Sequence, residues 1–492
     1  MSYNHQIEQF NIENPGSLYS KRGSGMSSNN DISQDVDSND NIIFENASAS
    51  TDRLRSSKYG IKKSFCGIRS DTEISGILNI VVSAIGGGCF SLPHIMYDGG
   101  IIVSLLIFLF VTVCVAYSID LLRSFVVDTK YFSFALMTET ILGHQWLQLY
   151  AVSSFIIYVS MEVSYLDSIY GYIKNIFSDH SDTIWFYIIY FSLSMIIEVF
   201  ICFYISKVSK MHLLSILSIS CFFILLISLI IFSLLANINH EVGRKFTIDN
   251  LFFPRINPDT AMNRLLKIAS YLTEYVYSYS YHSTFPTLIG NLQHVTHSKT
   301  QKVHLISFGI IFGAYFLTTF FGFIMSDKVP DEMFKNYRDY FEDDWAYLIV
   351  PYTIVLCIYL LTLIPIRFIV LRDNYITLIG EKKMTNTKEL IIICIFVFIC
   401  NIFAFAFENF ATSLKSLNIK FILQTFGGMF GVIISFCLPV VNYVSVNGKR
   451  KIKSFIGYLI TGFFMIVGLL STVNSIYQII FGNNEDNEEG KE

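Results

Sequence analysis

Long runs of apolar residues alternate with short polar segments along most of this chain of 492 residues. A helix needs about 20 apolar residues to cross the hydrocarbon core of a bilayer, and we count eleven such runs. Their limits are 75–97, 101–122, 146–173, 183–206, 212–236, 264–293, 304–326, 345–367, 389–408, 419–446 and 454–481. The pattern therefore predicts an all-α integral membrane protein with eleven transmembrane helices.

The first apolar run is interrupted in its middle by Gly86, Gly87 and Gly88, and Pro93 follows before the run ends. The bilayer core holds no water to satisfy free backbone groups, so an irregular turn there must be buried in protein or line a polar cavity. In secondary transporters such unwound helices hold the substrate. Glycines also serve close packing of membrane helices, so a second broken helix is needed to favour transport.

A second break is expected in the sixth run, where Tyr277, Ser278, Tyr279 and His282 precede Pro286. Proline within a helix removes a backbone hydrogen bond and bends the chain. Runs one and six are an odd number of crossings apart, so two consecutive five-helix units have opposite orientations in the membrane. Broken helices at corresponding positions of such inverted repeats mark a binding site near the midplane. We therefore expect a 5+5 inverted repeat plus one extra helix, with the site at the two breaks.

Composition agrees with a membrane protein, since 52% of the residues are hydrophobic and 15% are charged, against roughly 25% charged in a soluble domain. The residues before the first run are rich in Ser, Asn and Asp and hold too little apolar surface to form a core. We expect a disordered N-terminal tail (1–70), a transmembrane domain (71–481) and an acidic C-terminal tail (482–492).

Basic residues favour one orientation in the membrane. With the N-terminus in the cytoplasm, most arginines and lysines lie on the cytoplasmic side, and Arg367 at the end of the eighth run is counted among them. The positive-inside rule then predicts a multi-pass protein with a cytoplasmic N-terminus and, after eleven crossings, an extracellular or luminal C-terminus. The plasma membrane and an acidic organelle such as a vacuole or lysosome are both compatible with this topology.

Three motifs resemble those of the amino acid/auxin permease family. The segment Ile85–Pro93 resembles that family's Gly-x-Gly-Ile-Leu-x-Leu-Pro signature in the first helix. Tyr277-Ser278-Tyr279 with the downstream Pro286 is similar to its Phe-Ala-Phe segment, and Leu363–Arg367 is similar to its Phe-Pro-x-Arg ending of the eighth helix. The resemblance covers roughly residues 70 to 481. It implies a transporter of amino acids with the leucine-transporter type of fold.

An amino acid presents an ammonium and a carboxylate group, and helix ends can hold both. Unwound N–H groups favour the carboxylate, and exposed carbonyls favour the ammonium or a cation. Glycines allow the backbone to approach the ligand closely because they lack Cβ. The predicted substrate-binding residues are Gly86, Gly87, Gly88, Tyr277, Ser278 and Tyr279. The alternative for the tyrosines is an aromatic packing face whose hydroxyls bond to neighbours.

Ionisable groups within a span are costly to bury, so each is a functional candidate. The candidates for ion coupling are Glu162, Glu274, His282 and Thr353. The two glutamates could take up protons or bind a cationic substrate, and His282 could respond to pH. Thr353 could offer its hydroxyl to sodium, together with carbonyls of the first helix. Each can instead be a neutral packing residue, and Asp120 is expected to pair with Arg123 at the cytoplasmic end.

Neither a Walker motif nor a Cys/His spacing typical of metal sites occurs in the sequence. We expect no cofactor, no metal and no enzymatic activity. Transport is expected either to be facilitative, down the gradient of the substrate, or to be secondary active and coupled to a proton or a sodium ion. The expected partners are the amino acid substrate and the lipid bilayer, not nucleic acid, and the oligomeric state is left open with a monomer as the working expectation.

Three other functions are compatible with this pattern. An amino acid sensor would report a ligand to a cytoplasmic partner through the N-terminal tail. A channel is less favoured, because paired helix breaks point to alternating access. A membrane-embedded enzyme is least favoured, because the clustered His/Asp motif of polytopic transferases is missing from the sequence.

Overall fold

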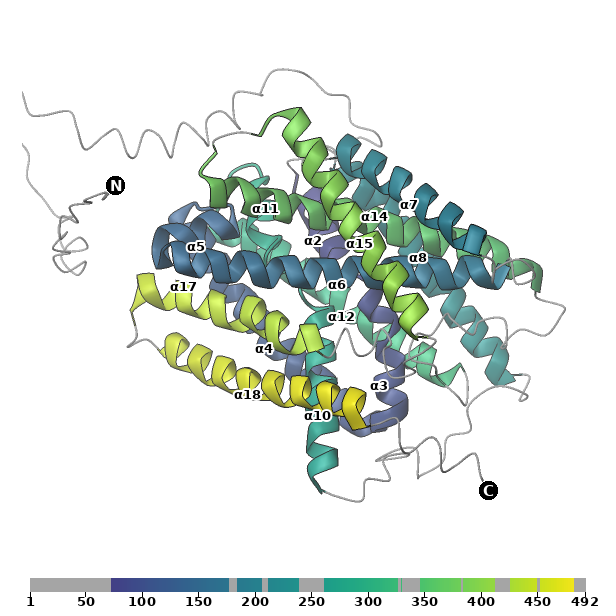
Figure 1. Ribbon diagram of the computed structural model, residues 1–492. Helices are drawn as coiled ribbons and strands as arrows, with labels where there is room; N and C mark the ends of the chain where they lie inside the picture. The colour runs from purple at the N-terminus through teal and green to yellow at the C-terminus, as the bar shows by residue number, and fades with distance from the viewer. Residues whose placement is uncertain are drawn as a thin grey trace, which may run out of the picture. The chain divides into compact units, whose positions relative to one another are not determined.

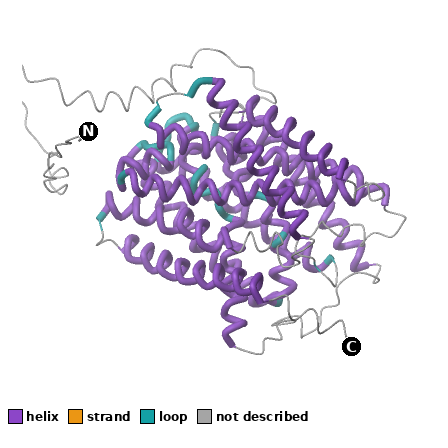
Figure 2. The backbone as a smooth tube through the Cα atoms, in the orientation of Figure 1, coloured by secondary structure: helices purple, strands orange, loops and turns teal. Residues whose placement is uncertain are grey.

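The computed structural model describes residues 72–176, 184–205, 211–238, 261–325, 329, 346–381, 384–411, 425–448 and 452–481. All of them belong to the larger of two compact units, which spans residues 64–492. The predicted tails 1–70 and 482–492 lie outside the described residues. Within the described ranges the chain forms helices joined by loops and no strand (Figure 2).

The described ranges consist mainly of helices (Figure 1). They are α2 (Glu73–Ala84), η3 (Gly87–Phe90), α3 (Leu92–Gly99), α4 (Ile101–Thr129), α5 (Phe134–Leu142), α6 (His144–Ile176), α7 (Ile184–Ile205), α8 (Met211–Ile238), α10 (Ala261–Ser278), α11 (Phe285–Gly290), α12 (His297–Ile324), α14 (Ala346–Ile379), α15 (Asn386–Ala411), η6 (Gly427–Gly431), η7 (Ile433–Cys437), α17 (Leu438–Asn447) and α18 (Ile452–Phe481). Of these, η3 is a 3₁₀ helix, and η6 and η7 are π-helical turns that precede α17.

Among the described residues, 8 helices are long and apolar enough to cross a membrane, and α2 with α3 makes a possible ninth span that is bent by 59°. The fourth expected run coincides with α7, and the sixth coincides with α10 and α11. Every expected apolar run thus contains helix. The number of eleven crossings stays a prediction.

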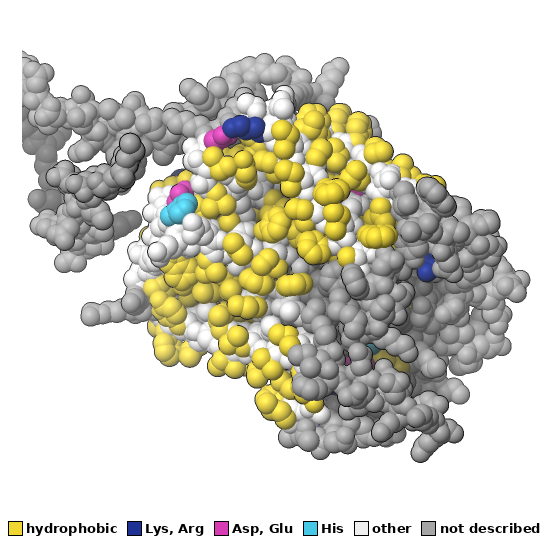
Figure 3. Space-filling view, viewed as in Figure 1, with side chains coloured by type: hydrophobic (Ala, Val, Ile, Leu, Met, Phe, Trp, Pro, Cys, Tyr) yellow, Lys and Arg dark blue, Asp and Glu magenta, His cyan; other side chains and the backbone are white. Residues whose placement is uncertain are grey.

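Large apolar side chains cover much of the surface. Figure 3 shows a face on which they dominate, with charged side chains confined to a few places. On α15 and α18 the exposed residues include Ile391, Ile395, Phe398, Phe455, Leu459 and Ile466. Such exposure opposes solubility in water and fits contact with lipid chains. The protein is a multi-pass integral membrane protein.

Helix α14 differs from the prediction. The sequence places the end of the eighth span at Arg367, but α14 continues to Ile379, by about three turns. Arg367 is only 2% exposed and donates to a backbone carbonyl of α2. Arg372 lies 3.3 Å from both Asp373 and Glu389. Arg367 is satisfied by a backbone carbonyl and Arg372 by two carboxylates, so neither charge ends the helix. Arg367 therefore lies buried within α14 and not in a loop, as its inclusion among the cytoplasmic loop charges assumed.

Helix α5 forms where the sequence predicts only a loop. The hydroxyl of Ser133 accepts a hydrogen bond from the N–H of Leu136 and so caps the first turn. Phe134, Ala135 and Met137 are buried, and the helix packs against α6 and α17. With 9 residues it is too short to cross a bilayer, which is why hydropathy did not reveal it.

Two glycines permit close contact between α18 and η6. A Cβ added to Gly468 would overlap the carbonyl oxygen of Gly428, whereas a Cβ on Gly462 of the same helix would meet no atom within 4 Å. We predict that Gly468→Ala lowers the midpoint of thermal unfolding in detergent, because overpacking costs about 1–3 kcal/mol. The control Gly462→Ala should leave the midpoint unchanged or raise it slightly. Equal midpoints for the two variants would contradict this packing.

Candidate functional site

Helix is interrupted within the range of the first expected run and again within that of the sixth. Helix α2 ends at Ala84, Ile85 and Gly86 have extended backbone, and the chain continues as η3 and α3. Helix α10 ends at Ser278, and residues 279–284 are not helical. Pro93 and Pro286 each lie in the first turn of the following helix, where the missing N–H has no intrahelical acceptor to lose.

A tyrosine of α12 bridges the ends of the two interrupted helices. The hydroxyl oxygen of Tyr315 lies 2.6 Å from the carbonyl oxygen of Ala84 and 2.6 Å from that of Ser278. It carries one proton, so it donates to one carbonyl at a time. The last carbonyls of a helix have no partner within that helix. Tyr315 therefore donates a hydrogen bond to the last carbonyl group of α2 or to that of α10, in place of the N–H donor of the missing turn.

Two side chains of α14 complete the end of α2. Arg367 donates from Nη1 to the carbonyl oxygen of Ser83, at 2.9 Å. The Tyr359 hydroxyl donates to the carbonyl oxygen of Ile85, at 2.7 Å. In a bilayer no water is available for these groups, so α14 supplies the donors that the first break requires.

A cavity lies between the two breaks, with α6 and α14 forming its other walls. It is lined by Gly86, Gly88, Met161, Ser164, Tyr165, Tyr277, Ser278 and Arg367. In this conformation the free space inside it is about 20 Å³, enough for about one water molecule, so a substrate can enter only when the walls move apart.

The cavity wall carries polar groups that lack a full set of partners. Arg367 Nε has no hydrogen-bond partner among the described residues, and Nη2 lies 3.5 Å from the Tyr165 hydroxyl. The guanidinium carbon lies 5.8 Å from the centre of the Tyr158 ring. The Tyr277 hydroxyl likewise finds no partner in the described part of the chain. A buried cation is costly without a counter-charge, so these groups favour binding of an anionic group.

Residues 69–481 match the sequence profile of the family described as "Transmembrane amino acid transporter protein". The chain belongs to this family. The match confirms the resemblance to amino acid permeases that the motifs indicated, and it supports membrane transport over enzymatic function.

The fold of this family member is similar to crystal structures of a manganese transporter from Eremococcus coleocola. Two mutant forms of that transporter each show 10% sequence identity and a TM-score of 0.58, covering 85% of this chain and 89% of that chain. A complex with an aromatic bis-isothiourea substituted compound gives 11% identity and a TM-score of 0.57, with the same coverage. At such low identity the similarity shows the fold alone, which is of the leucine-transporter type.

Four of the six predicted substrate-binding residues line the cavity of this transporter. They are Gly86, Gly88, Tyr277 and Ser278. Gly87 begins η3 next to them. Tyr279 is buried elsewhere: its hydroxyl is 3.0 Å from that of Thr112, and its ring stacks on Phe308.

The predicted ion-coupling residues lie at four separate places outside the cavity lining. Glu162 is fully buried, and its carboxyl oxygens have no hydrogen-bond partner in the described chain. Glu274 is buried on α10 and interacts electrostatically with Tyr275. Thr353 is buried on α14, 14 residues before Arg367, which is about 21 Å along a helix.

His282 lies in the non-helical segment between α10 and α11. It is fully buried, its ring is 6.4 Å from that of Phe436, and neither ring nitrogen has a partner among the described residues. It interacts electrostatically with His304 of α12. The described residues contain no group of three His, Cys, Asp or Glu that could hold a metal ion.

Sequence reasoning missed the α6 and α14 walls of the cavity, above all Arg367 and Tyr165. Met161 and Tyr165 are four residues apart and therefore share one face of α6. A usable signal was present at Arg367, because Phe368, Ile369 and Val370 continue the apolar run beyond it. An arginine inside a long apolar run is a functional candidate by the same rule that selected Glu162.

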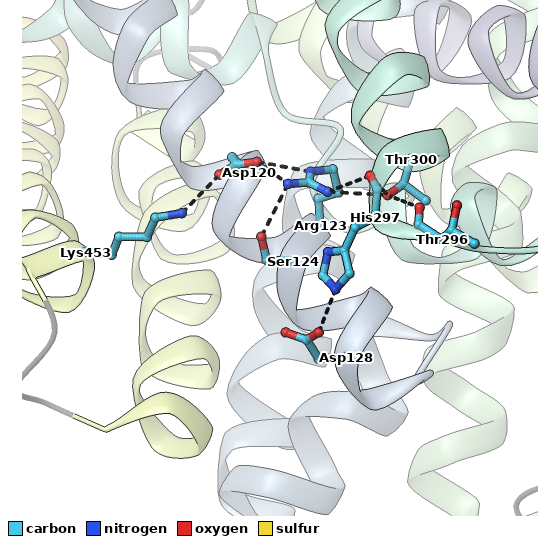
Figure 4. Close-up of polar contacts among 8 residues, drawn as sticks. All are labelled: Asp120, Arg123, Ser124, Asp128, Thr296, His297, Thr300 and Lys453. Carbon is cyan, nitrogen blue, oxygen red and sulfur yellow. Dashed lines mark hydrogen bonds and ion pairs between the residues drawn. The ribbon is translucent and has the colours of Figure 1, made fainter. Parts of the chain in front are cut away.

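A second polar cluster, the α4-end network, lies at the end of α4 (Figure 4). Asp120 accepts from Arg123 at 2.7 Å and lies 3.7 Å from Lys453 of α18. Arg123 also donates to the carbonyl oxygen of His297, at 3.2 Å, and the His297 ring pairs with Asp128, at 2.8 Å. The predicted Asp120–Arg123 pair is confirmed. The network joins α4, α12 and α18 at one end of the bundle.

Gly86 sets the width of the cavity. A Cβ at this position would lie 2.6 Å from the Tyr165 hydroxyl and 3.2 Å from Arg367 Nη2. We predict that Gly86→Ala lowers amino acid uptake into cells by more than about tenfold, equivalent to about 1.4 kcal/mol, while surface expression is retained. Gly313→Ala is the control, because a Cβ there meets no atom within 4 Å. Normal uptake by Gly86→Ala would show that the substrate binds elsewhere.

Proposed function

We propose that this protein is a secondary transporter of amino acids that binds its substrate in the cavity between the helix breaks and works by alternating access. The observation that carries this proposal is the buried guanidinium of Arg367, which lines the cavity with a free N–H. The planar fork of arginine matches a carboxylate. Together with family membership, this favours a ligand that bears a carboxylate.

The two charged groups of an amino acid find different surroundings in this cavity. The carboxylate binds at Arg367, where the first N–H groups of η3 add donors without intrahelical partners. The ammonium lies toward hydroxyl oxygens, and those of Ser164 and Tyr277 belong to cavity-lining residues. Met161 faces the same space and packs against the substrate side chain.

Alternating access requires a closure on each side of the cavity. At one end, Lys302 pairs with Glu73 at the start of α2, at 3.1 Å. Lys302 lies two residues after Thr300, which accepts a hydrogen bond from Arg123 of the α4-end network. At the other end, His94 Nδ1 lies 2.9 Å from the carbonyl oxygen of Val329, and Tyr97 packs in an apolar cluster with Phe323. We propose that opening each side breaks the contacts of that side. With the N-terminus in the cytoplasm, as the remaining basic residues predict, the α4-end network closes the cytoplasmic side.

The break in the first span is poorly suited to sodium. Coordination of sodium at such a break uses free backbone carbonyls, but the carbonyls of Ser83 and Ile85 already accept hydrogen bonds from Arg367 and Tyr359. The Ala84 carbonyl shares the one Tyr315 proton with Ser278. The guanidinium charge also repels a second cation. Thr353, the predicted hydroxyl ligand, lies six residues before Tyr359, about 9 Å along the helix.

We predict that a sodium gradient does not drive transport. Purified protein in proteoliposomes should take up labelled amino acids equally fast with an inward sodium gradient and with a matched potassium gradient, because the break offers no free sodium site. An empty-vesicle control subtracts leakage. Faster uptake with sodium than with potassium would contradict this assignment.

The second test asks whether Arg367 binds the substrate carboxylate. Arg367→Lys should lower uptake by at least about tenfold across a panel of labelled amino acids, because an ammonium cannot bind the substrate and the Ser83 carbonyl in the same fork geometry. Arg372→Lys, on the same helix, is the control and should retain uptake. In the wild type, amino acid amides, which lack the carboxylate, should fail to compete with labelled substrate.

If amides compete as strongly as free amino acids, Arg367 does not bind the substrate carboxylate. This result comes from the wild type, so it holds even if the Arg367 variant does not fold. Saturable binding without flux in the same vesicles would favour the amino acid sensor over the transporter.

A further inference from the structure

His94 on α3 has a hydrogen-bond acceptor in front of each of its ring nitrogens. Its Nδ1 lies 2.9 Å from the backbone carbonyl oxygen of Val329, and its Nε2 lies 3.2 Å from a carboxyl oxygen of Asp98, one turn further along the helix. A carbonyl oxygen and an ionised carboxylate can only accept. A neutral imidazole carries one N–H, whereas the imidazolium carries two. The protonated ring therefore fits this arrangement.

A neutral ring beside a protonated Asp98 would satisfy the same atoms, because the carboxyl O–H could donate to Nε2. That arrangement holds the same number of protons, since the proton has only moved from Nε2 to the carboxyl group. In either case the pair binds one proton more than a neutral imidazole beside a carboxylate.

Loss of this proton removes the contact between α3 and Val329. The single N–H of a neutral ring bonds more strongly to the carboxylate of Asp98 than to an uncharged carbonyl. Nδ1 then presents a lone pair to the Val329 oxygen, and two acceptors repel each other at this distance. Histidine changes its charge between about pH 5 and pH 8. The contact therefore forms at acidic pH and is lost at mildly alkaline pH.

The contact closes the end of the first span beyond the break. Val329 follows the end of α12 by five residues, and it belongs to a buried apolar cluster with Tyr97 of α3 and Phe323 of α12. The side chains of His94 and Asp98 are 13% and 22% exposed. Water reaches both of them, so they can exchange a proton while the apolar cluster stays buried.

Two phenols and one carboxyl group are the nearest other titratable groups on α3 and α10. The Tyr97 ring lies 6.0 Å from that of His94. The Tyr271 ring of α10 lies against Gly99, and it interacts electrostatically with Asp98 and Glu274. Phenols are neutral near neutral pH in their ordinary state, so neither tyrosine competes with His94 for the proton.

The other elements packed against α3 are η3, α4 and α12. The first three turns of α4 and the last two turns of α12 hold no ionisable side chain, and η3 contributes the buried thiol of Cys89. Asp327, Lys328 and Asp331 flank Val329 in the sequence but lie outside the described residues. Within the described part of the chain, Asp98 is thus the charged partner of His94.

We propose that His94 and Asp98 form an acid-sensitive latch, which holds this side of the transporter closed with a proton bound and releases α3 from Val329 when the proton leaves. The inference rests on the proposed function, in which opening this side breaks the contact of His94 with Val329. Each transport cycle must open this side, so protonation of the latch slows the cycle. With the N-terminus in the cytoplasm, the latch responds to the pH outside the cell or in the lumen of an organelle.

Exchange at equal pH on both sides of the membrane tests the latch without a proton gradient. Proteoliposomes with full-length protein are loaded with an unlabelled neutral amino acid and receive the same compound labelled. The compound is alanine, glutamine or leucine, whichever enters fastest. Wild type should exchange at least about fivefold more slowly at about pH 5.5 than at about pH 8, because a charge-assisted hydrogen bond must break in each cycle.

Two variants should lose this pH dependence in opposite directions. His94→Leu removes both donors, so at about pH 5.5 its exchange should be as fast as that of wild type at about pH 8. In Asp98→Asn the amide can donate to Nε2 of a neutral ring while Nδ1 donates to Val329, so exchange should be slow at both pH values. A merely structural role of the two side chains would change both rates in the same direction.

The control is His144→Gln. His144 is an exposed histidine whose Nδ1 lies 3.6 Å from a carboxyl oxygen of Glu139, so it has the same kind of partner but does not contact α3 or Val329. This variant should keep the pH dependence of wild type.

Thermal unfolding in detergent gives a second readout that needs no transport. The midpoint of wild type should exceed that of His94→Leu by more at about pH 5.5 than at about pH 8, because a group that binds its proton more tightly in the folded state adds stability at low pH. A difference between the midpoints that is the same at both pH values would overturn the latch.

Equal exchange by wild type at the two pH values, or an unchanged pH dependence in His94→Leu, would also overturn the latch and leave the proposed transport function standing. If wild type exchanges no amino acid, the proposed function fails, and the midpoints still decide whether the latch binds a proton. If His94→Leu does not fold, Asp98→Asn decides: slow exchange at both pH values supports the latch, and the pH dependence of wild type contradicts it.

Discussion

The need to satisfy backbone groups in a medium without water governs this structure. A helix interrupted in the bilayer leaves carbonyl groups free, and side chains of other helices bond to them in this protein: Arg367 and Tyr359 from α14, and Tyr315 from α12. These three donors keep the first break open without solvent. The cavity exists because the helical turn that would have filled it is absent, and side chains of α12 and α14 supply the hydrogen bonds that this turn would have made.

Arg367 serves both the scaffold and the cavity. One nitrogen of its guanidinium fixes the end of α2, and the rest of the group lines the empty space. A lysine could do one of these tasks, because its ammonium is a single point charge, whereas arginine presents donors in several directions. The same side chain links the break and the cavity, so a change of charge in the cavity is felt at the end of α2.

Much of this architecture could be predicted from the sequence. Long apolar runs located the helices, and Gly86–Gly88 and Pro286 located the two interruptions, because glycine and proline act on the backbone locally. The cavity walls on α6 and α14 could not be found in this way, since they depend on which helix faces the breaks. The end of α14 was misplaced because Arg367 and Arg372 find partners far away in sequence. Periodicity also missed α5, which is stabilised by packing on α6 and α17.

Tyr315 has one hydrogen and two acceptors at the same distance. Either Ala84 or Ser278 is therefore without that donor at every moment, and the two arrangements differ only by a rotation of the hydroxyl. The ends of α2 and α10 therefore cannot both hold this hydrogen bond at the same time. A movement of these two helix ends relative to each other costs little energy, because the hydrogen bond lost at one carbonyl is regained at the other.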